Sequence, residues 1–392
     1  MKKWKQICLI VFFMFLVASP GYAADEETIL NLGIDQQLEK LPLDEMEQLL
    51  TSIDEDISQY MPEMSLREML RNILNGTLSF NAQDFMQGLF QIFRHEVALS
   101  LNVIGKLIFL AVLSAVVMNL QGAFEKSSIH KIADFVILSI VIILILSSVN
   151  EVLTVGRETL TRLTNFMQVL MPIQLILLVA LGSVNSVAIL QPSLFLMINV
   201  ISSLFTYVIF PFIYFEVVLK LVNHLSDAFK VDKLASMFKG LILSIVSISS
   251  TVFLAILSIQ GIGGAVVDGV SIRTAKYMTD AFVPVVGGML SDIMETMVGG
   301  SLLIKNSFGI LGLVALILIT LVPAIKLFVI YLLYKFAAAL VQPLGDSKVV
   351  AIISDMANSL LLVFVAVIFV AVMFFFTIVI ITTTANFAVM LR

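Results

Sequence analysis

The sequence predicts an all-α, polytopic helical membrane protein with a small N-terminal helical segment outside the cytoplasm. Three observations predict this class. Of 392 residues, 59% are hydrophobic and 13% are charged, with a mean hydropathy of +1.05. The stretch from Leu163 to Phe215 contains no Asp, Glu, Lys or Arg. Residues 25–97 hold fifteen acidic residues against four basic ones. Because soluble domains are about 45–50% apolar and roughly 25% charged, a soluble enzyme is excluded.

Residues 1–23 have the form of a secretory signal peptide. Three lysines within the first five residues make a basic start, residues 7–18 are apolar, and small residues lead to an expected cleavage point after Ala23. An uncleaved membrane anchor is the alternative. In both cases the basic flank stays in the cytoplasm, so the chain from residue 25 is expected to begin outside.

Residues 24–97 form an acidic segment in which we expect short amphipathic helices. From Leu43 onward apolar residues recur at helical spacing. Ser65-Leu-Arg-Glu68 matches a capping box and predicts a second helix, and Asn81 can begin a third. The apolar stripes of these helices can pack on the membrane body as a small cap, or they can form a docking domain for a partner. The sequence leaves both alternatives open.

Residues 98–392 form the predicted multi-span membrane domain. A span needs about 20 apolar residues, and seven segments meet this length. They are 98–120, 133–155, 168–190, 194–219, 240–260, 307–333 and 357–384. The charge-free stretch is expected to be a hairpin of two spans interrupted at residues 191–193. The distribution of Lys and Arg favours another topology, in which 168–190 is re-entrant and broken near Pro172.

Residues 261–300 are predicted to be an interfacial or re-entrant insertion between two spans. Two Gly pairs near its end permit sharp bends or a close approach of helices and would bracket a short helix. With the prolines of neighbouring segments, the glycines make a candidate hinge or pore segment. Its residues are Pro172, Gly263, Gly264, Pro284, Gly287, Gly288, Gly299, Gly300 and Pro323.

Lys326 and Glu216 form the candidate intramembrane polar site. Charges inside a bilayer are a functional hypothesis by default, although snorkelling of the lysine to the headgroups is a plainer alternative. A faint internal repeat places Pro211 and Pro323 at equivalent positions, with Glu216 and Lys326 a few residues beyond each. Glu216 is therefore a possible counter-charge for Lys326.

The sequence indicates no catalytic, cofactor-binding or metal site. Its one cysteine, Cys8, lies in the leader, and its three histidines lie far apart without metal-ligand spacing. The glycine-rich run at residues 261–269 lacks the Gly-Lys-Ser/Thr of a phosphate-binding loop. No clustered basic face suits nucleic acid. We therefore expect a non-enzymatic membrane component or a transporter.

Four motifs together resemble one known family. They are Leu-Pro-Leu-Asp-Glu-Met-Glu (41–47), Gly-Ile-Gly-Gly-Ala-Val-Val-Asp-Gly (261–269), Phe-Val-Pro-Val-Val-Gly-Gly-Met-Leu-Ser-Asp (282–292) and Ser-Asp-Met-Ala-Asn-Ser-Leu (354–360). With the leader and the length, they make the chain similar to the stage III sporulation protein AE family of endospore-forming bacteria over essentially its whole length.

The resemblance implies a non-enzymatic subunit of a secretion-like channel complex that joins the mother cell to the forespore. The implied location is the mother-cell membrane around the forespore. The implied partners are the other stage III A-operon membrane proteins, their cytoplasmic ATPase, a forespore membrane partner and the lipid bilayer. The alternative is a secondary transporter or permease that uses the proline-broken segments with Glu216 and Lys326 as its polar site.

Overall fold

The computed structural model describes residues 43–58, 82–121, 128–225, 230–282, 287–344 and 348–390. Within these ranges the chain is helical apart from short turns, and it has no strand. The elements are α3 (Leu43–Ser58), α5 (Ala82–Gln121), α6 (Ser128–Ala180), α7 (Val184–Leu204), the π-helix η1 (Phe205–Ile209), α8 (Phe210–Leu225), α9 (Asp232–Phe282), α10 (Gly287–Val341), the 3-10 helix η2 (Gln342–Leu344) and α11 (Lys348–Met390). The all-α prediction is confirmed.

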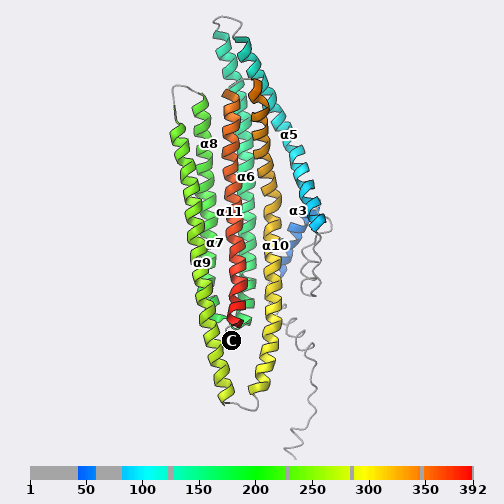
Figure 1. Cartoon of the computed structure of the whole chain (residues 1–392), viewed down its shortest axis with the longest axis vertical. Helices are drawn as coiled ribbons and strands as arrows, with labels where there is room; N and C mark the ends of the chain where they lie inside the picture. Colours follow the sequence, from blue (N-terminus) through cyan, green and yellow to red (C-terminus); the bar gives the residue numbers. More distant parts are fainter. Residues whose placement is uncertain are drawn as a thin grey trace, which may run out of the picture.

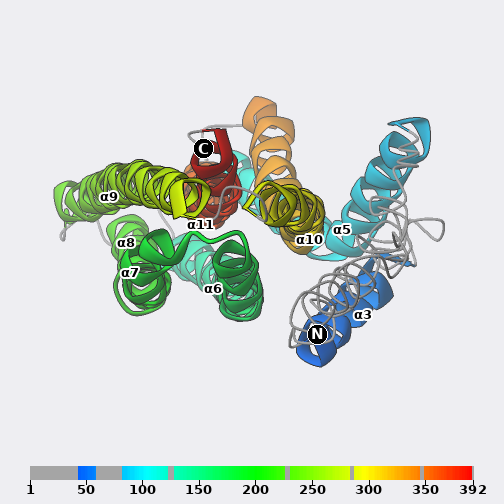
Figure 2. The same cartoon turned by 90° about the horizontal axis from the view of Figure 1, so that it is seen from below.

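The long helices run up and down beside one another in an elongated bundle (Figure 1). Three helices, α6, α9 and α11, run in one direction. The opposite direction is taken by α7, by α8 that continues it, and by α10. Seen along the bundle, α11 lies between α9 and α10 (Figure 2). It packs against α10, α9, α6 and α8, so α11 is the central helix.

α11 takes this place because it is apolar on every side. From Met356 the helix carries no charged residue. Ala357, Val363 and Met373 are each at most 1% exposed, and at 100° per residue they lie on different sides of the helix. A helix that is hydrophobic all round is stable only when neighbours cover it.

Five helices in the described part of the chain are long and apolar enough to cross a membrane. They are Phe135–Ala180, Val184–Leu225, Asp232–Ser271, Val298–Val341 and Lys348–Thr384, and the bent helix α5 would make a sixth. The shortest has 37 residues, which is about 55 Å at 1.5 Å per residue. The hydrocarbon core of a bilayer is about 30 Å thick, so part of the bundle extends beyond it.

The segments 133–155 and 168–190 do not form two separate helices. α6 is continuous for 53 residues and contains the first segment and most of the second. Between them the chain has no proline and one glycine, Gly156, so no local signal ends the helix there. The number of membrane crossings stays a prediction.

The turn between α6 and α7 lies at Gly182, and not at residues 191–193. Gly182 has φ 80°, a left-handed conformation that glycine adopts without strain. The Ser183 N–H donates to the Leu178 carbonyl at 3.1 Å, which is the Schellman pattern of a helix C-terminus. Pro192 lies inside α7. The glycine, rather than the proline, therefore ends the helix.

α3 confirms the amphipathic helix predicted from Leu43. Met46, Leu50 and Ile53 are at most 6% exposed, and α3 packs against α10 and α6. The apolar stripe of α3 thus covers the membrane body of its own chain. The signal peptide and the capping box at Ser65 lie outside the described residues, so they stay predictions.

Candidate functional site

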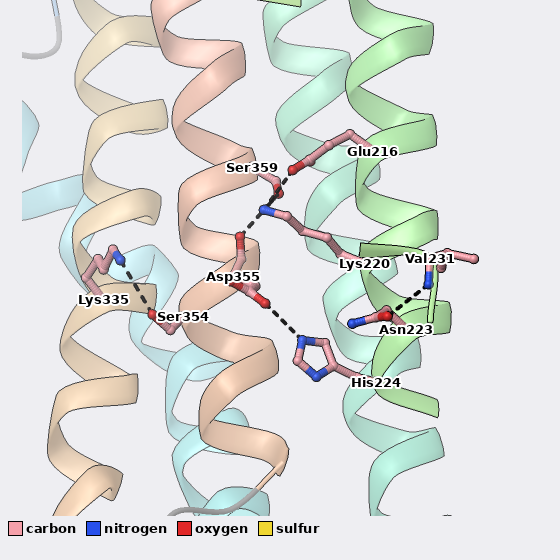
Figure 3. Close-up of polar contacts among 9 residues, drawn as sticks. All are labelled: Glu216, Lys220, Asn223, His224, Val231, Lys335, Ser354, Asp355 and Ser359. Atoms are coloured by element: carbon pink, nitrogen blue, oxygen red, sulfur yellow. Dashed lines mark hydrogen bonds and ion pairs between the residues drawn. The ribbon is translucent and has the colours of Figure 1, made fainter. Parts of the chain in front are cut away.

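Charged side chains form a ladder along the contact between α8 and α11 (Figure 3). Glu216 and Lys220 lie one turn apart on α8, with 2.7 Å between Oε1 and Nζ. Lys220 Nζ also donates to Ser359 Oγ of α11 at 3.3 Å. The Glu216 side chain is fully buried and the Lys220 side chain is 11% exposed. The ammonium therefore neutralises a carboxylate that water does not reach.

The ladder continues toward the C-terminal end of α8. His224 Nε2 lies 2.9 Å from Asp355 Oδ2, and the Ser359 hydroxyl donates to the Asp355 carbonyl at 3.2 Å. The His224 and Asp355 side chains are 17% and 40% exposed, so this end reaches the surface. Beside it, Lys335 of α10 donates to Ser354 of α11 at 3.5 Å (Figure 3).

Residue spacing explains why these groups face one another. Glu216, Lys220 and His224 are four residues apart and share one face of α8. Asp355 and Ser359 share one face of α11 in the same way. Sequence reasoning singles out only Glu216, because the partners on α11 are more than 130 residues away. A search for polar residues at four-residue spacing in an apolar stretch would have found Lys220 and His224.

Lys326 pairs with another helix. Its Nζ lies 3.0 Å from Glu151 Oε1 of α6, and these side chains are 28% and 54% exposed. The predicted pairing of Lys326 with Glu216 is therefore wrong. Glu216 pairs with Lys220, which lies one turn away on the same helix. An ion pair with Lys326 would require α8 and α10 to pack against each other at the level of these two residues.

The predicted hinge residues that the structure describes all lie in long, continuous helices. Pro172 lies within α6 and Pro323 within α10. Gly263 and Gly264 lie in α9, and Gly287, Gly288, Gly299 and Gly300 lie in α10. The two Gly pairs do not bracket a short helix, since α10 begins at the first pair and continues through the second. Residues 261–282 are thus the end of α9 and residues 287–300 the start of α10. Pro284 lies outside the described residues.

The motif at residues 261–269 joins α9 to α7. A Cβ on Gly264 would lie 2.9 Å from the Ser186 Cα, whereas a Cβ on Gly263 would meet nothing within 4 Å. One turn on, the fully buried Asp268 accepts the N–H groups of Asn185 and Ser186, each at 2.9 Å. A carboxylate there satisfies the free N–H groups that begin α7. Gly264 and Asp268 therefore have packing and capping roles.

Lys305 of α10 is a buried charge that sequence reasoning missed. The residue is fully buried, and its Nζ donates to the Thr382 carbonyl of α11 at 2.6 Å. The Thr382 hydroxyl in turn lies 3.4 Å from Gln174 Oε1 of α6. The position of Lys305 in an apolar part of the sequence is the signal that could have identified it. Lys305, Thr382 and Gln174 thus form a second polar contact, which joins α6, α10 and α11 and is separate from the ladder.

The chemistry of these groups is charge pairing and hydrogen bonding between helices. In the described ranges, no group of three or more His, Cys, Asp or Glu residues is placed to hold a metal ion. Carboxylate, ammonium, imidazole and hydroxyl groups inside an apolar bundle can hold helices together and can interact with ions.

Two comparisons with known proteins agree. The family model described as stage III sporulation protein AE matches residues 64–385. The stage III sporulation protein AE of Bacillus subtilis (strain 168) is 32% identical over 352 residues, which cover 90% of this chain and 88% of that protein. No solved structure matches the chain.

Proposed function

The chain belongs to the stage III sporulation protein AE family, and we propose that it is a non-enzymatic subunit of a channel complex between mother cell and forespore. As a member of this family with five helices able to span a bilayer, it is a sporulation-related, multi-pass membrane protein. Assembly with other proteins and a location in the mother-cell membrane are parts of the proposal, as is an N-terminal segment outside the cytoplasm.

A polar face on the outside of α6 and α7 supports a role as a subunit. Gln168 Nε2 of α6 donates to Asn199 Oδ1 of α7 at 3.2 Å. Asn165, one turn before Gln168, is exposed on a side of α6 that also lines a cavity with α3 and α10. Asn199 and Ser203, one turn apart on α7, are exposed as well. All four residues lie in the charge-free stretch of the sequence.

Such amides are costly against lipid chains, because lipid offers them no hydrogen-bond partner. Between helices of neighbouring membrane proteins they form hydrogen bonds and favour association. The face is therefore suited to a helix of another subunit. We propose that this subunit is one of the other stage III A-operon membrane proteins. The further proposed partners are the cytoplasmic ATPase and a forespore membrane protein, with the bilayer around the bundle.

A paired replacement tests this role. Asn165→Leu with Asn199→Leu makes the face apolar, which suits lipid and leaves membrane insertion favourable. Tagged protein is purified from sporulating cells, and the membrane proteins that accompany it are quantified by mass spectrometry. We expect at least tenfold less of the other stage III proteins and a matching fall in spore yield, at an unchanged amount of the variant in the membrane.

The matched control is Ile176→Leu with Val200→Leu, because these residues are exposed on the same two helices and stay apolar. The control should keep its partners. A full set of partners with the Asn165/Asn199 variant would contradict the proposal.

The ion pairs favour a second candidate, a secondary transporter. Lys326 with Glu151, and the ladder that begins at Glu216, place charges within long apolar helices, as transporters do. The purification above separates the two roles. A transporter should come alone or as a homo-oligomer, whereas a channel subunit should bring other stage III proteins with it.

A further inference from the structure

A small cavity of about 230 Å³ lies between α5, α6 and α10. It is separate from the ladder of α8 and α11. Its polar lining consists of two carboxylates, three hydroxyls and one ammonium, and apolar residues complete the wall. The polar groups are Glu96, Ser100, Ser148, Glu151, Lys326 and Tyr334.

Two polar groups in this lining are buried, and one of them has an oxygen without a partner. Glu96 is 5% exposed and Tyr334 is 1% exposed. Within the described residues, Glu96 Oε2 has no hydrogen-bond partner, and the Tyr334 hydroxyl interacts with the Ser148 hydroxyl alone. Leaving a buried polar group unsatisfied costs about 1–3 kcal/mol, and more for a charged one. Native proteins rarely leave a buried carboxylate oxygen unpaired in a cavity unless something else occupies it.

The fixed charges of the cavity do not balance. Glu96 and Glu151 contribute two negative charges, and the Lys326 ammonium contributes one positive charge. Lys326 lies 3.0 Å from Glu151 and is therefore committed to that carboxylate. Burial away from water opposes the ionised form of Glu96, whereas the charges of Lys326 and of His95, the preceding residue on α5, favour it. One further positive charge inside the cavity would balance the two carboxylates.

We propose that this cavity binds one small monovalent cation of the size of Na⁺. Carboxylate and hydroxyl oxygens are the ligands that hard cations prefer. Glu96 supplies an unused carboxylate oxygen, and the hydroxyls of Ser100, Ser148 and Tyr334 line the same space. A divalent ion would exceed the missing charge. The volume admits an ion with a few waters, since each water takes about 30 Å³.

The exposure of the lining gives the cavity an open and a closed end. The Glu151 and Lys326 side chains are 54% and 28% exposed, whereas Glu96 and Tyr334 are almost fully buried. An ion enters past the Glu151–Lys326 pair and reaches the buried oxygens behind it. Because Glu96 is on α5 and Tyr334 on α10, the bound ion links α5 to the bundle.

Thermal unfolding of the full chain in nanodiscs tests the site directly. The midpoint is measured in NaCl and in choline chloride at equal ionic strength, since the methyl groups of choline prevent the close oxygen contacts that a bare cation makes. We expect the midpoint to rise with Na⁺ and then saturate, and to change little with choline. Glu96→Gln should raise the half-saturating Na⁺ concentration at least tenfold, and Tyr334→Phe should raise it severalfold.

The matched control is Glu158→Gln, which removes an exposed carboxylate of α6 that does not line this cavity. It should keep the wild-type Na⁺ response. An equal response to choline and Na⁺, or a Glu96→Gln variant with the wild-type titration, would overturn the site. Where Glu96→Gln does not fold, an unchanged titration of Tyr334→Phe overturns it. No other sporulation protein is needed, so this result is independent of the proposed channel role.

Discussion

Removing the Lys220 ammonium is expected to destabilise the bundle strongly. The buried Glu216 carboxylate lies 2.7 Å from that ammonium. At an effective dielectric constant of about 20, two unit charges at this distance attract by about 6 kcal/mol. That attraction offsets a desolvation cost of several kcal/mol per ion. Lys220→Met keeps a long side chain but leaves Glu216 without its ion partner. We expect the free energy of unfolding to fall by about 3–5 kcal/mol.

The assay is denaturant unfolding in detergent micelles, followed by the far-ultraviolet circular dichroism of the helices. Glu216→Leu combined with Lys220→Met removes both charges. It should return stability to within about 1 kcal/mol of wild type, because a buried pair replaced by apolar groups is often neutral. Lys233→Met, at an exposed position on α9, is the control and should change stability by under about 0.5 kcal/mol. A loss below about 1 kcal/mol for Lys220→Met, or a double variant as unstable as the single one, would refute the reasoning.

The contact between α9 and α7 makes two further predictions, both measured by the same unfolding assay. Gly264→Ala should lose about 1–3 kcal/mol, because its Cβ would lie 2.9 Å from a backbone atom. Gly263→Ala, in open space, should gain up to about 1 kcal/mol as alanine favours the helix; equal effects at the two glycines would disprove the close approach. Asp268→Ala should lose about 1–2 kcal/mol because it leaves two N–H groups of α7 without their acceptor. Asp268→Asn keeps one acceptor oxygen and should lose less; if neither change lowers stability, the carboxylate does not cap α7.

The sequence predicts the helices better than it predicts their ends. Helical spacing identifies α3 at Leu43, and long apolar stretches identify the main helices. The end of α6 was missed, because Gly182 and Pro192 are both plausible stop signals within ten residues. The backbone of the folded chain distinguishes the two residues. Gly182 adopts the left-handed conformation that lets the chain turn, whereas Pro192 lies inside α7.

The sequence also identifies charges within apolar stretches without identifying their partners. Glu216 and Lys326 both prove to be paired, but to Lys220 and Glu151 rather than to each other. Each pair depends on a different kind of information. The pair within α8 follows from four-residue spacing, whereas the pair between α10 and α6 depends on which helices are neighbours and how they are aligned.

The sequence by itself determined the class of this protein: an all-α membrane protein whose motifs resemble those of one sporulation family. The free energy of moving a helix out of water depends on the number and spacing of its apolar side chains, and both are known from the sequence. Only the tertiary structure decided the contacts of Glu96, Asp268, Lys305 and Tyr334. Hydrogen bonds and ion pairs require atoms within a few ångströms, and only the packing of helices brings residues so distant in sequence that close.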